Sequence, residues 1–181
     1  VPGIDADRVG RWLEEQPLGL AGPLTFTRVG EGQSNLTFRV DDGAGRRLVL
    51  RRPPLGKILA SAHDVVREHR ILTALGPTGF PVPRTLGLCE DVAVTGAPFF
   101  VMEHVDGLVL SRVATAETLA PETRAQLGRQ IAATLAQLHE VDIDAAGLGD
   151  FRRPESLISR QLRRWRRQWD ASKTRELTDI E

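Results

Sequence analysis

A glycine-rich segment between two strand-like stretches is the first feature of the sequence that could do chemistry. It reads Gly30-Glu31-Gly32-Gln33-Ser34-Asn35. Glycines let a backbone approach a ligand closely and turn its N–H groups toward anionic oxygens. The segment is therefore a candidate phosphate cradle, and an ordinary hairpin turn is the alternative interpretation.

A cation and a carboxylate follow at positions where they could meet. Strand alternation puts Arg51 on the same face as Val49. Glu68 shares one face of a helical stretch with Val65 and Leu72. A carboxylate inside an apolar stripe is costly unless a cation meets it, so Arg51 is the expected partner of Glu68. The alternatives are an Arg51 that reaches water at the strand end and a Glu68 that reaches water at the edge of the stripe.

An apolar strand that runs into a short polar segment is the last of these features. It reads Phe99-Phe100-Val101-Met102-Glu103-His104-Val105-Asp106-Gly107. Its polar end could present backbone C=O and N–H groups to the edge of a purine. A buried strand followed by a turn is the alternative.

The periodicity of apolar residues predicts the elements that must position these groups. Period-two alternation predicts strands over 24–29, 36–40, 48–51, 92–94 and 99–103. Helical spacing predicts helices over 5–15, from 61 or 64 to 75, over 121–139 and over 154–170. The expected fold class is α+β: a five-stranded antiparallel sheet with one helix inserted after the third strand, followed by a helical part.

Composition narrows the class of protein further. The 181 residues carry a net charge of +0, and no apolar run is long enough to span a membrane, so we expect neither a nucleic-acid partner nor a membrane. Cys89 is the single cysteine, which excludes an internal disulfide and favours a cytoplasmic location. The last predicted helix is rich in arginine, but Ile158, Leu162 and Trp165 form an apolar stripe along it. That stripe indicates packing against another helix rather than binding to nucleic acid.

In this order, the features resemble the aminoglycoside phosphotransferase-like family, relatives of choline and homoserine kinases. The resemblance is greatest to the phosphotransferase domain found fused to acyl-CoA dehydrogenases, and it covers residues 10–170. It is carried by Gly30-Glu31-Gly32-Gln33-Ser34-Asn35, Leu50-Arg51-Arg52-Pro53-Pro54, Arg67-Glu68, Pro81-Val82-Pro83-Arg84, Phe100-Val101-Met102-Glu103 and Leu135-Ala136-Gln137-Leu138-His139.

The resemblance implies an ATP-dependent kinase of small-molecule hydroxyl groups that uses Mg²⁺. Residues 1–105 would be a kinase-like N-lobe with an additional N-terminal helix. Residues 106–181 would be the hinge and the first helices of the helical C-lobe. A non-catalytic, pseudokinase-like module that regulates a partner is the alternative function.

The resemblance also implies roles for particular residues. The phosphates would be covered by Gly30, Gly32, Ser34 and Asn35, and Arg51, oriented by Glu68, would hold the α- and β-phosphates. Adenine would lie beside the gatekeeper Met102 and be read by the Glu103 carbonyl and the Val105 amide. Two residues depart from the kinase-type pattern. Asn35 replaces the last glycine of the loop, which suits the Ser-Asn version of this family, and Arg51 replaces the usual lysine, with which it is not freely interchangeable. The neighbouring Arg52 is therefore a second candidate for the phosphate contact.

The catalytic loop of the family, His-Gly-Asp followed by an Asn, and its later metal-binding Asp have no counterpart in this sequence. We therefore expect no catalytic residue and no metal ligand here, and the 181-residue chain alone to be inactive. Because it begins at Val1 and its one methionine is Met102, we expect it to be a piece of a longer product. An uncovered apolar stripe would also be compatible with a homo-oligomer.

Overall fold

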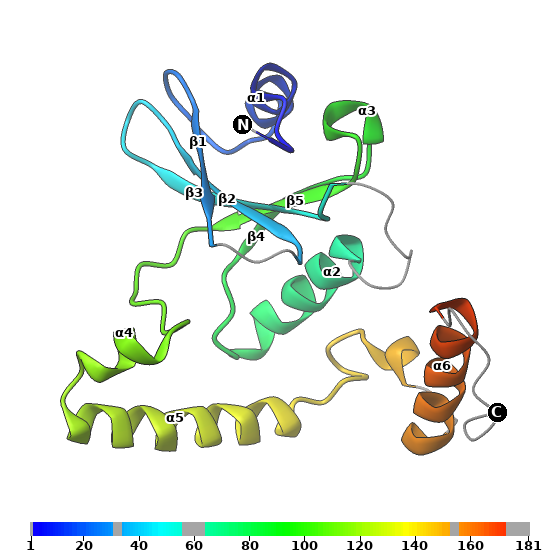
Figure 1. Cartoon of the computed structure of the whole chain (residues 1–181). Coiled ribbons are helices and arrows are strands. Elements are labelled where there is room, and N and C mark those ends of the chain that lie inside the picture. The colour runs from blue at the N-terminus through cyan, green and yellow to red at the C-terminus, as the bar shows by residue number, and fades with distance from the viewer. Residues whose placement is uncertain (1, 31–33, 56–63, 153–155, 173–181) are drawn as a thin grey trace. The chain divides into compact units, whose positions relative to one another are not determined.

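Five antiparallel strands form one sheet in the order β1-β2-β3-β5-β4 (Figure 1). The structure is a computed structural model, and it describes residues 2–30, 34–55, 64–152 and 156–172. The strands are β1 (Thr25–Val29), β2 (Leu36–Asp41), β3 (Arg47–Arg52), β4 (Thr85–Cys89) and β5 (Phe99–Glu103). The helices are α1 (Ala6–Glu14), α2 (Val65–Leu75), α3 (Val92–Thr95), α4 (Val113–Glu117), α5 (Pro121–Glu140) and α6 (Leu157–Ser172), with short 3₁₀ turns at Gly76–Thr78 and Gly149–Phe151.

The helix α2 follows the third strand, as the sequence predicts, so the α+β class and the inserted helix are confirmed. Its first residue follows Asp64, whose side chain accepts a hydrogen bond from the Arg67 backbone N–H at 2.9 Å. An N-cap of this kind satisfies one of the free donors of the first turn and fixes where the helix begins. The alternative start at Ser61 lies outside the described residues.

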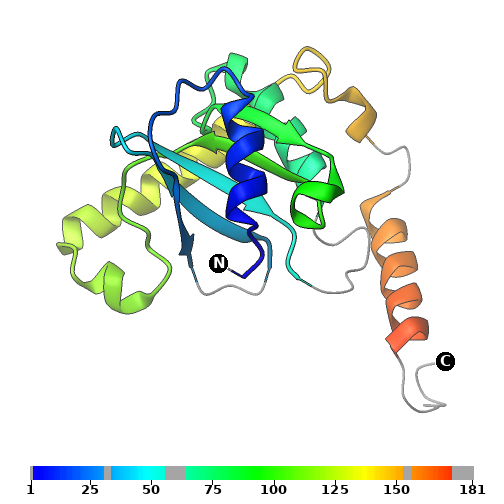
Figure 2. The same ribbon diagram turned by 90° about the horizontal axis from the view of Figure 1, so that it is seen from above.

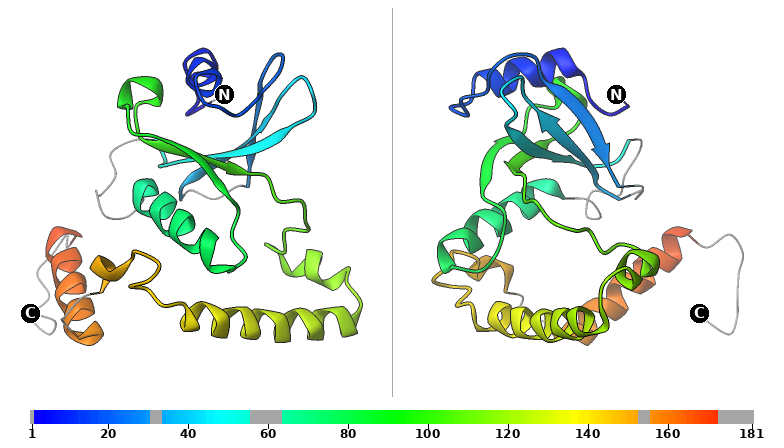
Figure 3. Two further views of the ribbon diagram at one scale, coloured as in Figure 1. Left: turned by 180° about the vertical axis from the view of Figure 1, so that it is seen from behind. Right: turned by 90° about the vertical axis from the view of Figure 1, so that its left-hand side faces the viewer.

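The two faces of the sheet are covered by different helices (Figures 1 and 3). On one face, Val9 and Leu13 of α1 are fully buried in the main core with Phe38 and Leu50 of the sheet. Trp12 of α1 adds an edge-to-face ring contact with Phe99, and α1 lies across this face (Figure 2). Burial of these apolar side chains is the main force that holds α1 in place.

The helix α2 covers the opposite face. Its His69 makes an edge contact with the ring of Phe100, which is fully buried. Desolvation at this contact lowers the pKa of His69, and the charge of Glu90 partly opposes that effect. Register places Phe100 opposite Arg51 and Met102 opposite Val49, so these four residues share the α2 face.

The strand predicted over 92–94 is wrong, because these residues form the short helix α3. Both ends of α3 are capped: Asp91 accepts a hydrogen bond from the Ala93 backbone N–H at 2.8 Å, and Gly96 takes a left-handed conformation. These caps override the β preference of two valines. The fourth strand is instead β4, an edge strand with an irregular register near Gly87. The alternation of apolar and polar residues in this stretch is too weak to predict a strand.

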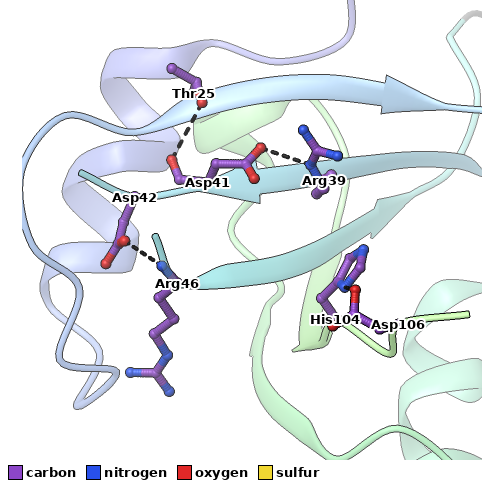
Figure 4. A network of polar contacts seen from close by, with 7 residues as sticks. All are labelled: Thr25, Arg39, Asp41, Asp42, Arg46, His104 and Asp106. Carbon is purple, nitrogen blue, oxygen red and sulfur yellow. Dashed lines mark hydrogen bonds and ion pairs between the residues drawn. The ribbon is translucent and has the colours of Figure 1, made fainter. Parts of the chain in front are cut away.

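The turn between β2 and β3 is organised by one carboxylate, that of Asp42 (Figure 4). Its oxygens accept hydrogen bonds from the backbone N–H groups of Ala21, Ala44 and Arg46, at 3.1, 2.9 and 2.7 Å. The bond from Ala21 is the largest cause of a lowered Asp42 pKa, which desolvation partly opposes. Asp42 therefore fastens the loop before β1 to the β2–β3 turn.

Asp42→Asn should lower the thermal midpoint by several degrees, because the new amide would turn an N–H group toward one of these donors. The pKa of Asp42 in the folded protein lies below its ordinary value of 3.8. The ionised carboxylate therefore stabilises the fold fully above pH 3.8, and this stabilisation is lost as the pH falls through the folded-state pKa. Thermal melts of the wild type and of Asp42→Asn are measured from neutral to strongly acidic pH. The difference between their thermal midpoints should shrink as the pH is lowered. Asp41→Asn, which removes only an ion pair with Arg39, is the matched control; equal effects of the two variants would contradict this role of Asp42.

The chain divides into two compact units, Val1–Asp142 and Ile143–Glu181. In the second unit, Arg152 and Asp144 form an ion pair at 3.0 Å. The apolar stripe of α6 is exposed, with Ile158 at 72%, Leu162 at 59% and Trp165 at 60% of their full accessible surface. Among the described helices, none combines the length and the apolar character needed to cross a membrane.

Candidate nucleotide site

Arg51 and Glu68 form an ion pair on the α2 face of the sheet. Arg51 Nε lies 2.6 Å from Glu68 Oε1, and the two side chains keep 28% and 33% of their surface exposed. The Nε atom itself is buried, and the contact is an ion pair without hydrogen-bond alignment. This pairing is the one expected from the sequence, and strand alternation together with the apolar stripe of α2 produces it.

Two further side chains join the pair, one just before β2 and one within it. Asn35 Nδ2 donates a hydrogen bond to Glu68 Oε2 at 3.1 Å, and Arg51 Nη1 donates one to Thr37 Oγ1 at 2.9 Å. Thr37 lies directly opposite Arg51 in the β2–β3 register. Thr37 is not among the site residues predicted from the sequence, although a hairpin register that pairs residue 37 with residue 51 would have indicated it.

Of the glycine-rich segment, the structure describes Gly30, Ser34 and Asn35, while Gly32 lies outside the described residues. Gly30 has φ +81°, a conformation that side chains other than glycine rarely adopt. Ser34 is exposed. Gly30 therefore begins the segment directly after β1, and Asn35 ends it in contact with Glu68.

The end of β5 and the residues after it are held by two arginines, Arg84 just before β4 and Arg47 at the start of β3. The Glu103 carboxylate pairs with Arg84 at 2.8 Å, and its backbone N–H bonds to the Arg84 carbonyl at 2.9 Å. Asp106 pairs with Arg47 at the start of β3, at 2.7 Å. Val105 between them is 69% exposed, and the described part of the chain offers its backbone N–H no partner.

His104 belongs to the same segment, and its side chain lies next to Asp106 (Figure 4). Its Nδ1 is buried and lies 3.6 Å from Asp106 Oδ1, too far for a hydrogen bond. The Arg47–Asp106 and Arg84–Glu103 pairs could not be predicted from the sequence, because residues so far apart in the chain are brought together only by the strand order.

Arg52 points to the opposite face of the sheet from Arg51. Only 3% of its surface is exposed, and its guanidinium donates hydrogen bonds to the carbonyls of Gly3, Pro53 and Thr95. Burial lowers the pKa of Arg52. Arg51 is thus the arginine that faces α2, and Arg52 is occupied with backbone carbonyls.

The described residues contain no group of three His, Cys, Asp or Glu side chains that could hold a metal ion. Cys89 is buried, and desolvation raises the pKa of its thiol. A buried thiol with a raised pKa is a poor nucleophile, so we assign Cys89 a packing role.

The model of the phosphotransferase enzyme family (APH) matches residues 25–181. The chain belongs to this family. A solved structure from Ralstonia eutropha JMP134, assigned as an aminoglycoside phosphotransferase, superposes with a TM-score of 0.70 at 32% identity. The match covers 95% of this chain and 49% of that one. The α+β, kinase-like fold expected from the sequence is thereby confirmed.

The chain is also similar to part of several larger proteins. It is 43% identical over 176 residues to IBR3 of Arabidopsis thaliana, assigned as an acyl-CoA dehydrogenase, covering 93% of this chain and 21% of that protein. It is 41% identical over 162 residues to acyl-CoA dehydrogenase family member 11 of Gallus gallus, covering 90% and 20%. The chain therefore spans about a fifth of the length of these relatives, and the resemblance to the fusion-type domain is confirmed.

Proposed function

We propose that this chain is the nucleotide-binding part of an ATP-dependent phosphotransferase that acts on a hydroxyl group of a small molecule. The observation that carries the proposal is the Arg51–Glu68 ion pair at 2.6 Å, beside the glycine-rich segment. A guanidinium held by a carboxylate on one side can present its remaining N–H groups to phosphate oxygens on another. Membership of the phosphotransferase family supports this use of the pair.

The surroundings of the pair suit a nucleotide. Arg51 keeps more than a quarter of its side chain exposed although its Nε is buried, so part of the side chain is accessible to a ligand. On the same face, Met102 lies opposite Val49 and would pack against an adenine ring. The exposed Val105 amide and the Glu103 carbonyl would bind the edge of that ring. Backbone N–H groups of the glycine-rich segment would cover the phosphates.

When bound, ATP supplies the γ-phosphoryl group that the acceptor hydroxyl takes up. The described residues would bind and orient the nucleotide: Arg51 would neutralise phosphate charge, and Glu68 would fix the direction of Arg51. Positioning and charge stabilisation are most of what a phosphoryl-transfer enzyme contributes. The acceptor belongs to the class of small hydroxyl compounds, and nothing in the described residues favours nucleic acid.

Arg51→Ala and Glu68→Ala should each weaken ATP binding by about tenfold or more, because each variant removes or misdirects a charge-assisted phosphate contact. Isothermal titration calorimetry of the full protein with ATP and Mg²⁺ measures the effect. Arg11→Ala removes an exposed arginine from α1 and is the matched control. ATP affinity that is equal in the wild type and in both site variants would refute the nucleotide site.

A further inference from the structure

The carboxylate of Glu68 is shared between two strands rather than reserved for Arg51. One oxygen lies 2.6 Å from Arg51 Nε on β3, and the other accepts a hydrogen bond of 3.1 Å from Asn35 Nδ2 at the start of β2. The amide of Asn35 is therefore turned toward α2. Its Oδ1 is buried and has no hydrogen-bond partner among the described residues, so the side chain is packed inward.

The guanidinium of Arg51 is held at two of its three nitrogens. Glu68 is next to Nε, and the Thr37 hydroxyl accepts a hydrogen bond from Nη1 at 2.9 Å. Arginine is a planar fork whose Nη2 carries two N–H groups. Anchors at Nε and Nη1 fix the plane of the fork and leave Nη2 for an anion.

We propose that Thr37 and the side chain of Asn35 are positioning residues, which act on the nucleotide phosphates through Arg51 and Glu68 rather than by touching them. This inference rests on the proposed function and adds two residues to its machinery. Asn35 then has two roles: its side chain positions Glu68, and its backbone belongs to the segment that covers the phosphates.

The need for a second anchor follows from the use of arginine at position 51. A lysine ammonium is a compact charge that binds phosphate from any direction, whereas a guanidinium binds well only when its plane is correctly oriented. The carboxylate of Glu68 alone leaves the guanidinium free to swing about that contact. The cross-strand position of Thr37 removes this freedom, since the register places the two residues directly opposite each other.

Thr37→Val keeps the shape of the side chain and removes only the hydroxyl, so it should weaken ATP binding by about fivefold, the effect of one lost hydrogen bond. Affinity for adenosine, which carries no phosphate, should be unchanged. Thr37→Ser should restore ATP affinity. Thr123→Val on α5, where the side chain is exposed, is the matched control and should bind ATP normally.

Double variants test whether the two residues act through their partners. Thr37→Val should have no further effect in an Arg51→Ala background, and Asn35→Ala should have none in a Glu68→Gln background. A ligand-free readout is the ¹⁵N signal of the Arg51 Nε–H, identified by its loss in Arg51→Lys. Its exchange with solvent should be faster in Thr37→Val than in the wild type.

Three results would overturn the proposal. If Arg51→Ala weakens ATP binding but Thr37→Val and Asn35→Ala do not, the positioning roles are wrong and the nucleotide site stands. If the losses of affinity persist in both double variants, the two side chains contact phosphate directly. If Arg51→Ala itself leaves ATP affinity unchanged, the proposed nucleotide site and this inference fail together.

Discussion

Arg52→Ala should lower the free energy of unfolding by about 3 kcal/mol, the largest stability effect expected for any arginine on β3. The Arg52 side chain is almost fully buried and donates to the carbonyls of Gly3, Pro53 and Thr95. Its loss leaves buried acceptors without donors and frees the segment that precedes α1. Urea denaturation measures the effect. In a protein with Trp165 and Trp169 replaced by Phe, the fluorescence of Trp12, which packs against Phe99, reports on α1.

The neighbouring Arg51→Ala is the matched control, because it removes the same side chain from the other face of the same strand. Its partner Glu68 is one-third exposed, so water replaces much of the lost ion pair and the stability changes by less. In the fraction of Arg52→Ala that remains folded, ATP affinity should equal that of the wild type. A stable Arg52→Ala protein with weak ATP binding would instead make Arg52 the phosphate contact.

These two arginines show what the sequence could predict about the site. Strand alternation is local, so residues 51 and 52 had to face opposite ways, and the apolar stripe of α2 had to turn Glu68 toward the sheet. The pairing of Arg51 with Glu68 followed from the cost of leaving a carboxylate unpaired inside an apolar stripe. Which arginine faces the α2 side could be decided only once α1 and α2 were placed on the two faces.

The contacts that the sequence did not predict depend on register and on distant segments. Thr37 meets Arg51 only because the β2–β3 hairpin pairs them, and a shift of one residue would have separated them. The Asn35–Glu68 hydrogen bond joins residues that lie far apart in the chain. The strand predicted over 92–94 is wrong for a related reason. Two valines indicated a strand, but the hydrogen bond from the Ala93 N–H to the Asp91 side chain caps a helix there.

The polypeptide of 181 residues should not transfer phosphate from ATP to any hydroxyl acceptor above the background rate. Phosphoryl transfer requires a residue that orients the nucleophile and side chains that hold the metal beside the γ-phosphate. The His-Gly-Asp loop that the family resemblance implies does not occur in this sequence. The solved chain from Ralstonia eutropha JMP134 is about twice as long as the part of it that this chain matches.

A paired assay tests this expectation with ATP, Mg²⁺ and a panel of amino alcohols, sugars and hydroxy-acyl compounds. One sample is the 181-residue chain, and the other is a longer protein in which a His-Gly-Asp loop follows this segment. ADP release is measured in both, and Arg51→Ala in the longer protein should reduce it because nucleotide binding is impaired. A comparable rate from the 181-residue chain would mean that its own residues form the catalytic centre. The search for the acceptor-activating group would then return to the carboxylates nearest Arg51, beginning with Glu68 at 2.6 Å.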